Sequence, residues 1–70
     1  MALYKYYVND NDQPSGEHEV HAEWCKYVPQ IYSKTYLGVF ADSHAAVRQA
    51  RTVYVNVDGC ANCCPLSHTK

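Results

Sequence analysis

The residues with the clearest chemical meaning are a histidine and three cysteines, which fall into two pairs. His21 and Cys25 form a His-x3-Cys pair, and Cys60 and Cys63 form a Cys-x2-Cys pair near the end of the printed chain. Zn²⁺ takes four nitrogen or sulfur ligands in a tetrahedron, and a Cys-x2-Cys turn lets the chain reverse around the ion. Four protein ligands leave no open position, so the pattern predicts a structural zinc ion. No catalytic residue is predicted, and we do not expect an enzyme.

The ligand assignment has alternatives within the same sequence. Cys64 directly follows Cys63 and can replace either Cys63 or His21, and His18 and His68 are further candidates. Inert or redox-active thiols are the alternative to a metal site, because an isolated cysteine often behaves as a small buried hydrophobe. Three of the four cysteines lie between positions 60 and 64, however, and this clustering favours metal ligands. If zinc is bound, we expect Cys64 to be the accessible and most reactive thiol.

The elements that position these pairs are predicted from side-chain alternation and turn residues. Residues 3–8, 17–21 and 35–40 are rich in aromatic or branched side chains or alternate in polarity, and this favours three strands. Leu37 and Val39 are expected on one face of the third strand, and Tyr36 and Phe40 on the other. Turn-forming residues in 9–16 predict a hairpin loop. The segment 24–33 is predicted to be irregular, because Pro29 interrupts a strand there.

One helix is predicted after the third strand. Asp42 and Ser43 offer an N-cap oxygen, and Asp58-Gly59 offers a stop with glycine available for a left-handed cap. The apolar residues at helical spacing between these signals are Ala46, Ala50, Val53 and Val57, with Val47 and Tyr54 beside them. We expect Val47, Ala50 and Tyr54 to pack against Leu37 and Val39. The predicted fold over residues 1–70 is therefore α+β: an antiparallel sheet of about three strands, packed on one helix and closed by the Cys-x2-Cys knuckle.

Length and composition limit what such a chain can do. A chain of 70 residues forms one domain, and cores of this size commonly need a metal, a disulfide or a partner as a staple. The formal net charge of −1 gives no broad attraction to nucleic acid or anionic lipid. Neither a signal peptide nor a membrane span is predicted. We therefore expect a cytoplasmic protein whose thiols stay reduced and serve as ligands.

The sequence resembles the zinc-binding domain of the Ada DNA-repair family and its nuclease-appended variants. The resemblance covers residues 19–65 and rests on Val20–Pro29, Tyr36–Phe40, Ser43–Ala50 and Gly59–Pro65. It implies the zinc ligands His21, Cys25, Cys60 and Cys63. The chain is also similar to small stand-alone bacterial proteins of unknown function, which carry a Tyr-Tyr-Val-Asn strand and a Cys-Cys-Pro end.

Two departures from the repair family change what the resemblance implies. The family's first ligand is a cysteine that accepts a methyl group from DNA phosphate, whereas this chain has His21 there. The family also has basic residues around its last two cysteines, whereas Ala61 and Asn62 lie between them here. Methyl transfer and strong binding to duplex DNA are therefore not expected.

Two functions from different classes follow from these features. The first is a zinc-stapled binding module whose hairpin face or edge takes a protein or nucleic-acid partner. The seven tyrosines could add a stacking platform for single strands or peptides. The second is a thiol-based redox or metal-responsive protein that uses Cys63 and Cys64. A DNA-repair type of DNA-binding zinc domain is a more distant alternative.

Overall fold

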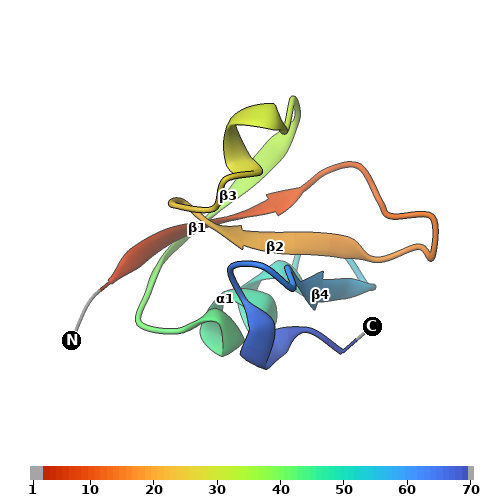
Figure 1. The fold of residues 1–70 in the computed structure, drawn as a ribbon. Helices are drawn as coiled ribbons and strands as arrows, with labels where there is room; N and C mark the ends of the chain where they lie inside the picture. The colour runs from red at the N-terminus through yellow and green to blue at the C-terminus, as the bar shows by residue number, and fades with distance from the viewer. Residues whose placement is uncertain (1–2, 70) are drawn as a thin grey trace.

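The described part of the chain folds into a sheet with one α-helix packed on one of its faces (Figure 1). The computed structural model describes residues 3–69. Its elements are β1 (Tyr4–Asn9), β2 (His18–Ala22), the 3-10 turn η1 (Val28–Gln30), β3 (Lys34–Phe40), α1 (Ser43–Ala50), β4 (Val57–Gly59) and the 3-10 turn η2 (Pro65–Ser67). The sheet has four strands in the order β3-β1-β2-β4. No helix within residues 3–69 is long and apolar enough to cross a membrane.

Strand β1 lies in the middle of the sheet, and its residues alternate between the two faces. Tyr6 and Val8 are buried, whereas Lys5 is exposed and Tyr7 is only partly buried. The antiparallel register pairs Tyr6 with Ala22 and Val8 with Val20, and both partners on β2 are fully buried. The helix therefore packs on the face that carries Tyr6 and Val8, and the opposite face carries Tyr7 and its neighbours.

Strand β3 contains a bulge that the sequence did not predict. Tyr6 pairs with Gly38 and Tyr7 pairs with Tyr36, so Leu37 is an extra residue in the ladder. The φ angle of Gly38 is +129°, a conformation that side-chain-bearing residues rarely adopt. Because the extra residue reverses the alternation, Leu37 is buried while Val39 is 47% exposed. The expectation that Leu37 and Val39 share a face is therefore wrong. The expectation that Tyr36 and Phe40 share the other face is wrong as well, because Phe40 packs against the core while Tyr36 is exposed.

The helix begins as predicted but ends earlier. The Asp42 carboxylate accepts a hydrogen bond from the backbone N–H of Ala45 at 2.9 Å, which confirms the N-cap. The helix ends at Ala50, and Val53 lies beyond it with 44% of its surface exposed. Branched residues fill the segment that follows, and they favour extended backbone over helix. Val57 accordingly lies in β4 rather than in the helix.

Strand β4 is a fourth strand that the sequence analysis did not predict. It pairs in parallel with β2, with Val57, Asp58 and Gly59 opposite His18, Glu19 and Val20. The sheet is therefore mixed and four-stranded, whereas an antiparallel sheet of about three strands was predicted. The α+β class, the single helix and the cysteine knuckle are as predicted.

The predicted helix packing holds only in part. Val47 and Ala50 are buried in the core with Leu37. Tyr54 lies after the helix, half-buried, where its ring stacks on His18 at a centroid distance of 3.7 Å. Its hydroxyl donates a hydrogen bond to an Asp10 carboxylate oxygen at 2.8 Å. Tyr54 therefore ties the end of the helical segment to the hairpin rather than to β3.

The bulge predicts unequal effects of two similar truncations. Leu37→Ala should lower the free energy of unfolding by about 2–4 kcal/mol, because it leaves a cavity in the core. Val39→Ala, on the exposed face, should lower it by no more than about 1 kcal/mol. Urea unfolding of both variants under identical metal conditions measures the difference. Equal losses would mean that β3 alternates regularly, without the bulge.

Candidate metal centre

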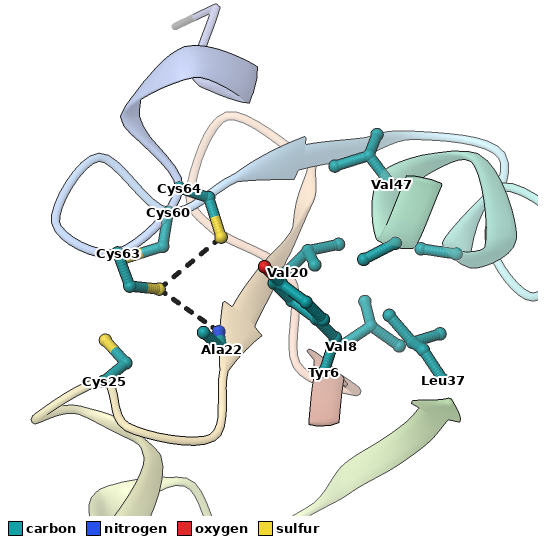
Figure 2. Close-up of a cluster of buried hydrophobic side chains, with 12 residues drawn as sticks. Tyr6, Val8, Val20, Ala22, Cys25, Leu37, Val47, Cys60, Cys63 and Cys64 are labelled. Carbon is teal, nitrogen blue, oxygen red and sulfur yellow. Dashed lines mark hydrogen bonds between the residues drawn. The ribbon is translucent and has the colours of Figure 1, made fainter. Parts of the chain in front are cut away.

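The structure brings His21, Cys25, Cys60 and Cys63 together at one end of β2. Their potential ligand atoms all lie within 4.8 Å of one another, and all four residues are buried. Figure 2 shows the Cys25 side chain facing the turn that carries Cys60 and Cys63. Ligand atoms around a tetrahedral zinc lie roughly 3.3–3.8 Å apart, given metal–ligand bonds of about 2.0–2.3 Å. Small side-chain movements would therefore suffice to enclose an ion.

Short backbone turns position the sulfur atoms. The N–H of Cys25 donates to the carbonyl of Ala22 at 3.0 Å, so the chain turns immediately after β2. The N–H of Cys64 donates to the carbonyl of Cys60 at 2.7 Å and closes the Cys-x2-Cys turn. The N–H of Ala22 then donates to Cys63 Sγ at 3.3 Å and joins the turn to β2 (Figure 2). Hydrogen bonds to sulfur favour the thiolate, which is the form that binds metal.

Glycine at position 59 permits the close packing of the knuckle. A Cβ atom there would lie 2.8 Å from the Cβ of Ser67 and 2.9 Å from the carbonyl oxygen of Cys64. Both distances are shorter than side chains tolerate, so a larger residue would push η2 and the knuckle away from β4. Gly59 therefore acts through close approach of backbone segments, and not as the helix stop that was predicted.

The His21 ring is held between the sulfur cluster and a carboxylate. Its Nδ1 lies 4.0 Å from Cys63 Sγ, and its Nε2 lies 3.5 Å from Glu19 Oε1. A metal-binding histidine usually donates its second ring N–H to a carboxylate or carbonyl group. Burial lowers the pKa of His21, which favours the neutral ring that metal binding requires.

The Cys60 and Cys63 thiols hold their protons strongly in the metal-free protein. Burial raises the pKa of Cys60 to about 12, more than the N–H groups of Cys63 and Asn62 lower it. The pKa of Cys63 is raised as well, first by its hydrogen bond with Cys64 and then by burial. Ionising both sulfurs in this buried space therefore requires a compensating positive charge, which a divalent cation would supply.

Cys64 is not the accessible thiol that was predicted. Only 1% of its surface is exposed, and it belongs to the hydrophobic core. Its sulfur lies 3.6 Å from Cys63 Sγ, and this hydrogen bond lowers the pKa of Cys64. The prediction of an exposed sulfur was wrong because the residue after the turn points into the core rather than to solvent.

The other candidate ligands lie outside the cluster. His18 Nδ1 is 2.9 Å from the Asn9 carbonyl oxygen, and the His18 ring stacks on Tyr54. His68 Nδ1 is 2.9 Å from the Gly59 carbonyl oxygen and 3.3 Å from Asp58 Oδ2. Both histidines therefore serve local packing and hydrogen bonding.

Two supporting residues were missed by the sequence analysis. Glu19 contacts His21, and the side-chain amide of Asn62 donates to Cys25 Sγ at 3.9 Å. Residues two apart on a strand share a face, so the spacing of Glu19 and His21 carried a usable signal. The contact of Asn62 depends on how the knuckle folds back to Cys25, which no local pattern shows.

Comparisons with models of protein families, with curated proteins and with solved structures give no match for this chain. The resemblance to the Ada zinc domain stays a prediction that rests on the residues quoted for it.

The raised thiol pKa values predict that metal binding releases protons. At neutral pH, Cys60 and Cys63 are protonated in the metal-free protein, whereas His21 is largely neutral. Loading Zn²⁺ should therefore release at least about two protons per chain, and the affinity should rise with pH. Calorimetric titration in buffers of different ionisation enthalpy measures the proton count. Release of fewer than one proton would contradict thiolate ligation.

Proposed function

We propose that the protein binds one Zn²⁺ ion through His21, Cys25, Cys60 and Cys63, and that the ion is structural. The observation that carries this proposal is the convergence of four buried ligand atoms within 4.8 Å. Three sulfurs and one imidazole nitrogen form a soft, tetrahedral ligand set that suits zinc. Protein atoms take all four positions, so the ion has no site for a substrate.

The proposed ion acts as a staple between distant parts of the chain. It would join the end of β2 to the knuckle after β4, which are linked otherwise by the short parallel pairing of these strands and by the hydrogen bond from the Ala22 N–H to Cys63 Sγ. Structural zinc contributes on the order of 10–16 kcal/mol in small zinc peptides. The core of a domain this small rarely supplies more than about 3–5 kcal/mol. Folding of the protein would therefore depend on the metal.

We infer that the stapled domain acts as a binding module through its surface. Large aromatic side chains remain exposed: Trp24, in the turn after β2, is 54% exposed, and Tyr36, on β3, is 53% exposed. Such side chains suit contacts with a protein or an unpaired nucleic-acid strand. With a net charge of −1, the protein has no excess of positive charge to neutralise DNA phosphates, so strong binding to duplex DNA is not expected.

The thiol-based alternative is less favoured by the geometry. A redox-active pair at Cys63 and Cys64 needs at least one sulfur that an oxidant or reductant can reach. Cys63 is 8% exposed and Cys64 is 1% exposed. Their burial supports a structural role for the cysteines over exchange with partners in solution.

The purified protein should contain close to one zinc per chain. Cys25→Ser removes a proposed ligand and should reduce the metal content and the thermal stability sharply. Cys64→Ser is the matched control, because it changes a buried neighbouring cysteine that is not a proposed ligand. It should retain the metal. Elemental analysis together with native mass spectrometry measures both.

Two results would contradict the ligand assignment. A folded wild-type protein that holds no metal after purification and zinc reconstitution would remove the structural role. Loss of zinc in Cys64→Ser with retention in His21→Ala would show a four-cysteine site instead.

A further inference from the structure

A pocket lies on the sheet face opposite the helix and shares His21 with the candidate metal centre. Its volume is about 300 Å³. Glu19, His21 and Asn9 line it from β2 and β1, and Tyr27, Gln30 and Ile31 line it from the segment around η1, with Gln13 at its hairpin side. His21 therefore faces the sulfur cluster on one side and the pocket on the other.

Glu19 gives this pocket its charge. Its carboxylate contacts the His21 ring at 3.5 Å, and no lysine or arginine among residues 3–69 forms an ion pair with it. A half-buried carboxylate of this kind is stabilised by a cation.

The remaining walls suit an organic cation rather than a bare ion. The amide side chains of Asn9, Gln13 and Gln30 offer oxygen acceptors for N–H donors. Tyr27 lines the pocket, and the face of a tyrosine ring attracts cations, as its contact with the Lys26 ammonium group at 5.3 Å illustrates. The pocket volume fits a small head group and not a large ligand.

We propose that this pocket binds a small organic cation with N–H donors, a guanidinium or primary ammonium group, with Glu19 as its charged partner. The cation would donate hydrogen bonds to the Glu19 carboxylate and to the amide oxygens, against the Tyr27 ring. A guanidinium group combines planarity with several donors, and both features match a carboxylate beside an aromatic ring.

The geometry of the pocket does not require the proposed zinc ion, but the charge of a zinc centre would act on a cation bound in the pocket. Zn²⁺ with three thiolates and a neutral histidine carries a formal charge of about −1. This negative centre on the far side of His21 would strengthen the attraction for a cation in the pocket. Binding is therefore expected to be tighter in the zinc-loaded protein than in any folded metal-free form.

Titration of the zinc-loaded protein with methylguanidinium, followed by amide NMR, tests the proposal. Saturable shifts should concentrate on the backbone amides of Asn9, Glu19 and Gln30. Methylammonium should give the same pattern. Urea shares the planar shape without the charge, and tetramethylammonium shares the charge without N–H donors, so both should bind at least about tenfold more weakly.

Variants identify the partner group. Glu19→Gln should weaken methylguanidinium binding at least about tenfold, and Gln30→Leu should weaken it severalfold. Glu23→Gln is the matched control, because Glu23 lies two residues beyond His21 and accepts a hydrogen bond from the Lys5 N–H outside the pocket lining. It should leave binding unchanged.

Zinc content is measured in every sample, so failure of the pocket and failure of the metal site are distinguishable. With zinc bound, three results would overturn the proposal: no saturable shifts, equal shifts with urea, or unchanged binding in Glu19→Gln. An absence of zinc in wild-type protein would instead count against the proposed function alone.

Discussion

The parallel pairing of β4 with β2 is the constraint on which the candidate metal centre depends. The N–H of Cys60 donates to the Val20 carbonyl at 3.0 Å, which fixes the start of the knuckle beside the end of β2. The knuckle then reaches Ala22 through Cys63 Sγ. Without this pairing, the His-x3-Cys and Cys-x2-Cys pairs would belong to separate parts of the chain, and no four-atom cluster would form.

Because the four residues of the cluster are buried, a metal ion would be needed to stabilise the thiolate forms of its cysteines. Removing thiolates from water is costly, and burial raises the pKa of Cys60 for this reason, whereas the pKa of Cys63 is raised first by its hydrogen bond with Cys64 and then by burial. A divalent cation would replace the protons and compensate the charge of the sulfurs. The carboxylate of Glu19 and the amide of Asn62 extend the arrangement beyond the ligands, since they contact His21 and Cys25 respectively.

The spacing of the ligand pairs was readable in the sequence, because a metal imposes local geometry on residues three or four apart. The α+β class and the helix N-cap at Asp42 were also readable, because both depend on signals within short stretches of sequence. The bulge at Leu37 and the strand at Val57–Gly59 were not, because each depends on pairing with a distant strand. The burial of Cys64 likewise follows from tertiary packing, which no local pattern encodes.

X-ray absorption spectroscopy at the zinc edge tests the central claim most directly, because it reports the atoms bound to the metal. For the zinc-loaded protein we expect three sulfur atoms at about 2.3 Å and one nitrogen atom at about 2.0 Å, the set offered by His21, Cys25, Cys60 and Cys63. Four sulfur atoms would place Cys64 in the site and remove His21. A shell dominated by oxygen atoms would show that the buried cluster does not bind the ion.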